Sequence, residues 1–194
     1  FLSGAFNKAY EGEVTELVNC PDVTWFGLEI DGEKIYPERS CLKSFERKLD
    51  IFSGELFIRY VFELSEMGEV LVENRRFASM AQTNLFAQSL RVQFLDGRNR
   101  QVKIKTGING QMTNSGVSHF HTSTARVYDK EIMEIRSELE NGTVTEAVGC
   151  KVVCGVQEEK EFNLKRRSVY GTYAVTPEDK EVIFEKVTFA DQGE

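Results

Sequence analysis

The chain has 194 residues, with 24 lysines and arginines against 31 aspartates and glutamates, so its formal net charge is −7. The acidic balance, without a basic stripe, argues against a general nucleic-acid or anionic-membrane binder, and no apolar run approaches the ~20 residues that span a bilayer. Hydrophobic residues make up 41% of the chain, and valine, isoleucine, threonine and the aromatics far outnumber alanine and leucine. The composition therefore predicts a soluble β-rich protein with a proper core and excludes disorder, collagen and coiled coil.

The first half of the chain alternates strand-like segments with turn signals. Residues 25–30 and 34–36 flank Asp31-Gly32, a dipeptide whose positive φ preference is typical of a type I′ hairpin turn. The Ser53-Gly54 and Asp96-Gly97 dipeptides mark further turns. Further strands are expected over residues 45–49, 55–63, 70–77, 85–95 and 101–105.

The second half is less regular. Residues 109–117 hold little apolar material and are expected to form an exposed loop. Residues 131–139 fit both a helical and a strand period, but the Asn141-Gly142 dipeptide that follows favours a hairpin, with Met133, Ile135 and Leu139 on one face. The remaining strands are expected over residues 145–153, 162–175 and 181–189.

These segments predict an all-β fold. Roughly ten to twelve strands exceed what a single compact sheet holds, so we expect a large antiparallel β-sandwich of two packed sheets, with few or no long helices. Without linker, repeat or low-complexity stretch, residues 1–194 are expected to form one domain. Because the chain starts at Phe1 without signal-peptide features and ends just after a strand pattern, we expect it to be a piece of a longer protein.

The cysteines indicate a reducing compartment. Cys150 and Cys154 would lie about 13 Å apart on a strand, whereas a disulfide needs Cα atoms within about 7 Å. Pairing with Cys20 or Cys41 stays open at this point. We interpret the four residues as free, buried, reduced thiols of a cytoplasmic protein.

His119 and His121 are the two histidines of the chain. On a strand, both imidazoles would lie on one face, where they could share a metal or act on a sugar hydroxyl. Zinc would need two further ligands, and Cys150 and Cys154 have a spacing that matches no finger pattern. We interpret the pair as polar residues facing solvent or a partner, and predict no metal site.

Charged residues cluster without forming a recognisable site. Paired carboxylates can hydrolyse a glycoside, but spacing alone does not place any pair across ~5–10 Å, so we expect solvated carboxylates. Neighbouring basic residues on a strand would point to opposite faces, which weakens any phosphate site. The formal glycosylation acceptor Asn141-Gly142-Thr143 is better explained by the hairpin turn. The groups concerned are Glu11, Glu13 and Glu16; Glu158, Glu159 and Glu161; Arg75 and Arg76; and Lys165, Arg166 and Arg167.

No known catalytic or phosphate-binding motif occurs in the chain: it has no GxGxxG, GxxxxGK[ST], GxSxG or HExxH pattern. We therefore predict no catalytic, cofactor-binding or metal-binding residues in this chain.

Several segments together resemble the N-terminal domain of glycoside hydrolase family 65, the family of maltose, kojibiose and trehalose phosphorylases. They occur in the same order across nearly the whole chain, and they look structural rather than catalytic. The segments are 16–22, the Asp31-Gly32 turn, 47–50 with 54–56, 76–80 leading into Leu85, and 182–187.

The resemblance implies a galactose mutarotase-like super-sandwich placed before an (α/α)6 catalytic barrel in the parent enzyme. The barrel would supply a glutamate general acid and a site for inorganic phosphate, a co-substrate that attacks the face of an α-glucoside opposite the leaving group. It implies a non-catalytic domain that needs no cofactor, packs on the barrel of the same chain and belongs to a homodimer.

The resemblance also suggests roles for single residues. Leu17, Val18 and Pro21 would pack an irregular segment against a sheet. Arg76 would satisfy buried carbonyls or a carboxylate such as Asp50, and Phe77 would be core on the opposite face.

Two other functions are compatible with the sequence. A free-standing carbohydrate-binding module would stack sugars on exposed aromatics, for which the chain offers Trp25, Phe26, Tyr36, Tyr60, Tyr170 and Tyr173. A mutarotase-like sugar epimerase would need a histidine acid, such as His121, with a glutamate base.

Overall fold

The computed structural model of the chain describes residues 5–8, 10–38, 41–64, 68–140, 142, 144–156 and 158–193. Within these residues the secondary structure consists of β-strands and turns, without a helix. No described segment forms a helix long and apolar enough to cross a membrane.

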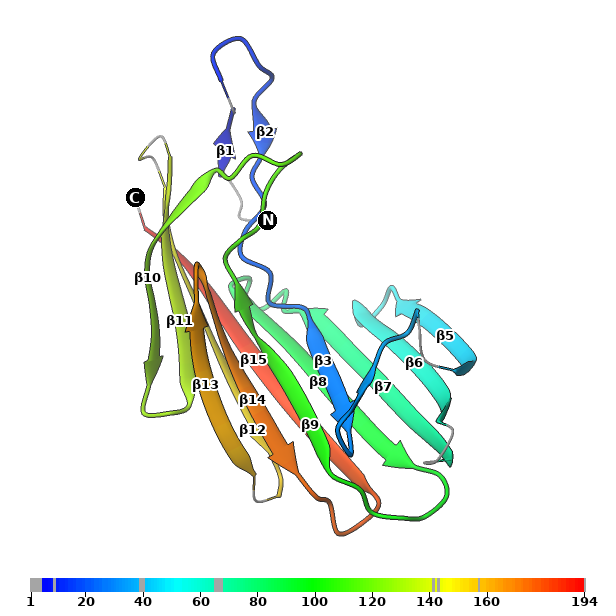
Figure 1. The fold of residues 1–194 in the computed structure, drawn as a ribbon. Helices are drawn as coiled ribbons and strands as arrows, with labels where there is room; N and C mark the ends of the chain where they lie inside the picture. The colour runs from blue at the N-terminus through cyan, green and yellow to red at the C-terminus, as the bar shows by residue number, and fades with distance from the viewer. Residues whose placement is uncertain are drawn as a thin grey trace.

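Two antiparallel sheets pack face to face (Figure 1). The larger has eight strands in the order β10 (Phe120–Tyr128), β11 (Ile132–Leu139), β12 (Thr145–Cys154), β15 (Glu181–Gly193), β8 (Leu85–Phe94), β7 (Gly68–Ala78), β6 (Glu55–Leu64) and β5 (Leu42–Asp50). The smaller has five, in the order β13 (Glu159–Lys165), β14 (Ser168–Val175), β9 (Val102–Asn109), β3 (Phe26–Ile30) and β4 (Glu33–Ile35). The predicted all-β sandwich is confirmed.

The core lies between the two sheets, because alternate residues of each central strand point inward. Along β11, the inward residues Met133, Ile135 and Leu139 are at most 1% exposed, as the strand interpretation of this segment predicts. The Asp31-Gly32 turn joins β3 to β4 with φ values of 46° and 87°, which is the conformation expected for a type I′ turn.

Two predicted segments were wrong in detail. Residues 162–175 form two strands, because Arg166 adopts a φ of 56° and turns the chain between β13 and β14. The stretch 109–117 is not simply an exposed loop, since Asn114 is only 8% exposed. Its amide donates to the carbonyl of Leu17 at 2.9 Å and its Oδ1 accepts from the backbone of Asn19 at 2.8 Å.

Asn114 thereby holds a projecting hairpin that the sequence did not predict. The short strands β1 (Phe6–Asn7) and β2 (Glu16–Leu17) pair with each other and rise above one end of the sandwich (Figure 1). We call residues 5–20 the arm. At its base Val18, 1% exposed, packs with Phe120, Leu139 and Val144, so the expected packing role of this residue is confirmed.

Lys186 links the two sheets from within the core. The residue lies on β15 and is 0% exposed, and its Nζ donates to the carbonyl of Val23 at 2.6 Å, to Thr106 Oγ1 at 2.9 Å and to the carbonyl of Gly107 at 2.8 Å. No carboxylate in the described part of the chain forms an ion pair with it. Burial lowers the pKa of Lys186 to about 8.

Replacing this lysine should weaken the fold. At pH 7 a Lys186→Met variant leaves three buried acceptors without their donor, so we expect a loss of about 2–4 kcal/mol in the free energy of unfolding. Urea denaturation of the wild type and the variant measures this loss. The exposed Lys151→Met substitution on the neighbouring strand is the control, with an expected change below about 1 kcal/mol.

The pH dependence gives a second readout of the same variant. Between pH 8 and 10.5 the unfolded lysine keeps its proton while the folded one releases it, so the stability contributed by Lys186 rises with pH across this window. The difference between wild type and Lys186→Met should therefore grow by on the order of 1–3 kcal/mol from pH 8 to 10.5. Parallel pH profiles would contradict this interpretation.

Candidate functional site

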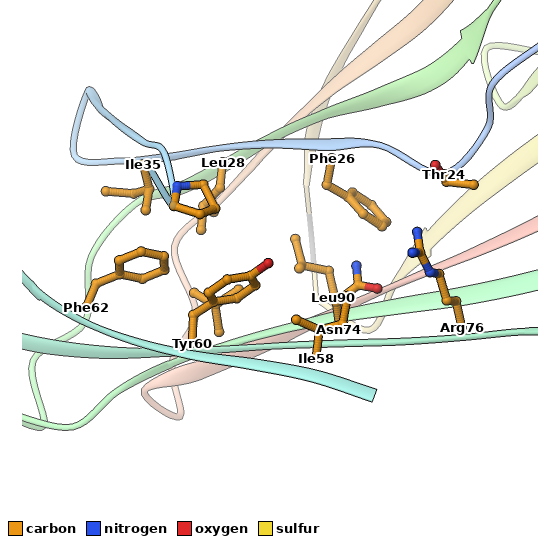
Figure 2. Close-up of a pocket in the computed structure, with 12 residues that line it drawn as sticks. Thr24, Phe26, Leu28, Ile35, Ile58, Tyr60, Phe62, Asn74, Arg76 and Leu90 are labelled. Atoms are coloured by element: carbon orange, nitrogen blue, oxygen red, sulfur yellow. The ribbon is translucent and has the colours of Figure 1, made fainter. Parts of the chain in front are cut away.

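A groove opens between the sheets at the side where β3 and β4 face β6, β7 and β8 (Figure 2). Its volume is about 210 Å³. The small sheet contributes Phe26, Leu28 and Ile35, and the large sheet contributes Ile58 and Leu90 among others, so most of the lining is apolar. Such a groove can hold an apolar or aromatic group.

Polar side chains gather at one end of this groove. Figure 2 shows Thr24, Asn74 and Arg76 there, away from Phe62 at the other end. Gln88 reaches the same place from β8, and its Nε2 donates to the carbonyl of Thr24 at 2.8 Å and to Asn74 Oδ1 at 3.5 Å. The lining offers binding contacts but no carboxylate, imidazole or thiol, since it contains no aspartate, glutamate, histidine or cysteine.

The expected partnership between Arg76 and Asp50 is wrong. Asp50 Oδ1 accepts hydrogen bonds from the backbone N–H groups of Phe52 at 2.9 Å and Ser53 at 3.4 Å, so it closes its own turn. These bonds lower the pKa of Asp50. Phe77 lies on the opposite face from Arg76, as expected, but it is 42% exposed and is not core.

The aromatics proposed for sugar stacking do not form one platform. Phe26 and Tyr60 line the groove, and Tyr173 is 1% exposed in the core. Trp25 and Tyr170 border a polar hollow on the other face of the small sheet, but Lys105 Nζ lies 3.6 Å from the ring centroid of Tyr170 and covers that ring. This arrangement does not favour a free-standing binding module.

The two histidines lie in different environments, contrary to the shared face predicted for them. His119 precedes β10 and is 1% exposed, with its Nε2 3.0 Å from Glu16 Oε1 of the arm. His121 lies on β10 with its side chain 69% exposed, 3.8 Å from Glu140. Among the residues that the structure describes, no three metal-ligating side chains gather.

The two groups of glutamates do not face each other. Glu16 of the first group contacts His119, just before β10 begins. The second group begins β13, where Lys160 lies 3.9 Å from Glu131 at the far turn of the β10–β11 hairpin. A nine-residue strand separates the two places, about 27 Å at ~3.4 Å per residue, which is too far for a glycosidase pair.

The basic residues serve the scaffold. Arg75 pairs with Glu55 at 3.4 Å on the outer face of the large sheet, opposite to Arg76, as strand alternation predicts. Arg167 donates to Ser118 and, at 3.1 Å, to the carbonyl of Phe120, and so ties the β13–β14 turn to the start of β10.

Two further sequence features are structural where they can be seen. Gly142 has a φ of 72° and its N–H donates to the carbonyl of Leu139 at 2.7 Å, in agreement with the expected turn, while Asn141 and Thr143 lie outside the described residues. All four cysteines are free thiols, but the expectation that they are buried is wrong for Cys41, which is exposed. Cys150 is buried, which raises the pKa of its thiol to about 11.

Lys186 and Glu146 are buried ionisable residues that were missed from the sequence. Glu146 lies on β12 at 1% exposure, directly opposite Ser137 of β11, and neither its carboxylate oxygens nor Ser137 Oγ has a hydrogen-bond partner within the described residues. Burial raises the pKa of Glu146 to about 7. Strand alternation could have predicted the burial of Glu146, because it lies on the same face of β12 as Val148 and Cys150.

Known proteins similar to this chain agree on its family. The sequence profile of the glycosyl hydrolase family 65 N-terminal domain matches residues 1–190. The chain belongs to this family. It is 32% identical over 160 residues to a kojibiose phosphorylase of Escherichia coli strain K12, and 34% identical over 152 residues to one of Halothermothrix orenii.

The family 65 domain covers only part of these relatives. The matches span 81% and 77% of this chain but 21% and 19% of the relatives, so the matched part of the chain covers about a fifth of their length. A solved structure, described as a candidate kojibiose phosphorylase from the human microbiome, shares the fold over 91% of this chain and 23% of its own, with a TM-score of 0.80 and 12% identity.

Glu146 of the family 65 domain, unpaired within the described residues, should make stability fall as pH rises. Between pH 4.5 and 7 the folded state keeps a proton that the unfolded state releases, so the contribution of this group is lost as pH rises through 7. At pH 8 a Glu146→Gln variant should be more stable than the wild type by about 1–3 kcal/mol, and the two should be nearly equal at pH 4.5.

Urea unfolding at both pH values measures this difference. The exposed Glu185→Gln substitution on β15 serves as the control and should not change the pH profile. A Glu146→Gln variant less stable than the wild type at pH 8 would show that Glu146 has a favourable partner there.

Proposed function

We propose that this chain is the non-catalytic scaffold domain of an enzyme that cleaves an α-glucosidic disaccharide with inorganic phosphate. The observation that carries the proposal is that the chain is 32% identical over 160 residues to a kojibiose phosphorylase. The matched segment makes up 21% of that protein's length. The described part of the chain supports a scaffold role, since its groove contains no carboxylate and its two glutamate groups lie far apart.

The reaction of the parent would be inverting. A carboxylic acid outside this domain protonates the glycosidic oxygen, while phosphate attacks the opposite face of the sugar. Phosphate arrives as an anion, so the base that would activate water is unnecessary. The domain of residues 1–194 would pack on the catalytic part of its own chain and shape the rim of that site.

The proposal extends to the compartment and the oligomeric state of the parent protein. Four free thiols support a reducing compartment, and we therefore place the parent in the cytoplasm. The family resemblance also implies a homodimer, which sedimentation of the full parent protein tests directly.

Phosphorolysis assays test the proposed function. The full parent protein, incubated with kojibiose, maltose or trehalose and inorganic phosphate, should release glucose 1-phosphate from one of them, whereas residues 1–194 alone should release none. Replacing phosphate by water is the control and should abolish turnover by the parent. Turnover by the isolated domain, or hydrolysis by the parent without phosphate, would contradict the proposal.

A further inference from the structure

Two adjacent turns at one end of the large sheet expose large apolar side chains. Phe52 is 97% exposed, Met80 90%, Ile51 79% and Leu49 63%. Single exposed apolar residues are ordinary, but a group of this size at one place on a small domain marks an interaction surface. We call Leu49, Ile51, Phe52 and Met80 the turn patch.

Hydrogen bonds hold the turn patch in a fixed shape. In the β5–β6 turn Asp50 Oδ1 accepts from the N–H groups of Phe52 at 2.9 Å and Ser53 at 3.4 Å. In the β7–β8 turn Ser79 Oγ accepts from the N–H of Gln82 at 3.0 Å. A partner that binds these turns therefore has little backbone to order, which lowers the entropic cost of docking.

The second turn of the patch lies beside the last strand. Strands β6 and β7 are paired, so the two turns are neighbours, and the N–H of Ala190 in β15 donates to the carbonyl of Asn84 in the second turn at 2.9 Å. β15 then continues to Gly193, which pairs with Thr145 of β12 on the side away from β8, so the last strand passes the second turn before it ends. The arm rises from the same end of the molecule (Figure 1), and it exposes Tyr10 by 66% and Val14 by 83%.

One cation beside the turn patch has no partner in the described part of the chain. Leu49, Leu56 and Arg76 face one another across β5, β6 and β7, and no described carboxylate forms an ion pair with Arg76. In contrast, Arg59 and Arg91 of the same sheet both pair with Glu73, at 3.9 and 3.1 Å. A complementary surface would be apolar and carry an acidic group near Arg76.

We propose that the turn patch is the surface on which the remainder of the longer family 65 polypeptide docks. This inference rests on the proposed function. The matches to this chain cover 21% and 19% of the relatives, so about four-fifths of each relative lies outside the matched segment. The corresponding part of the longer polypeptide is the partner that would dock on the turn patch. The exposed apolar turns, held by hydrogen bonds, provide the site, and Arg76, unpaired within the described residues, lies beside them.

Cysteine labelling of the full parent protein tests the proposal. Two variants are made in a Cys41→Ser background, Phe52→Cys in the turn patch and Leu164→Cys on edge strand β13, where the native leucine is 55% exposed. Peptide-resolved mass spectrometry follows the rate at which a maleimide reacts at each position. Although Phe52 is the more exposed residue in this domain, Phe52→Cys should react at least about tenfold more slowly in the parent, because the docked segment covers it.

Equal rates at the two positions, fast or slow, would overturn the proposal. A Met80→Cys variant, expected to behave like Phe52→Cys, guards against failure of a single substitution. Protection that disappears on dilution would assign the turn patch to a second copy of the chain and would also overturn it.

Phosphorolysis measured on the same samples separates the two proposals. If position 52 is protected but the parent shows no phosphorolysis, the proposed reaction is rejected and the proposed docking surface is retained. Phosphorolysis without protection removes only the docking surface. A parent no longer than this chain removes both.

Discussion

The sandwich depends on how the segment from Asp22 to Trp25 meets its hydrogen-bonding needs between the two sheets. The carbonyl of Asp22 accepts from Asn109 of β9 at 2.8 Å, but the next three residues are irregular and need other donors, because buried carbonyls without partners are costly. Three side chains from three strands supply the donors: Lys186 to Val23, Gln88 to Thr24 and Thr106 to Trp25, at 2.6 to 2.8 Å. Desolvating the ammonium of Lys186 is expensive, and its three acceptors offset that cost. The same bonds fix the large sheet against β9 and the start of β3, which sets the width of the groove.

Unequal sheet width explains why this domain leaves apolar surface uncovered. The five-stranded sheet ends at β4, whereas the eight-stranded sheet continues to β5 (Figure 1). Along one cross-strand row the exposed fraction falls from 55% at Phe45 to 5% at Val72 and 0% at Val92, with Tyr60 between them and its ring centroid 5.2 Å from that of Phe45. The apolar inner face of the large sheet therefore extends beyond the edge of the small sheet. The exposed apolar residues there follow from the unequal width of the two sheets.

The sequence predicted what local periodicity controls. Alternation located most strands, and Asp31-Gly32 identified its turn, because both signals act over a few residues. The arm was missed because Asn114 holds it across 95 and 97 residues of sequence, a distance over which no local pattern operates. The turn at Arg166 was missed because it contains no glycine or asparagine, and its positive φ is imposed by the pairing of Lys165 with Ser168.

Functional residues were harder to place than strands. The shared face expected for His119 and His121 assumed that both lie on a strand, but β10 begins between them at Phe120. Lys186 and Glu146 could have been found by counting strand parity, since each occupies an inward position among apolar residues. Parity alone, however, does not tell which of them has partners: Lys186 has three acceptors, whereas Glu146 has none within the described residues.

The segments that resemble family 65 coincide with these structural devices. Residues 16–22 lead from the arm into the segment that Lys186 and Gln88 hold, and residues 182–187 include Lys186 itself. Residues 47–50 and 54–56 flank the β5–β6 turn that holds Ile51 and Phe52, and residues 76–80 lead from β7 into the second turn and include Met80. A domain used only as a free-standing fold would need the first pair of features to be stable, but it would gain nothing from rigid turns that hold phenylalanine and methionine out in water. Docking on the rest of a longer protein, as proposed above, would account for these exposed side chains.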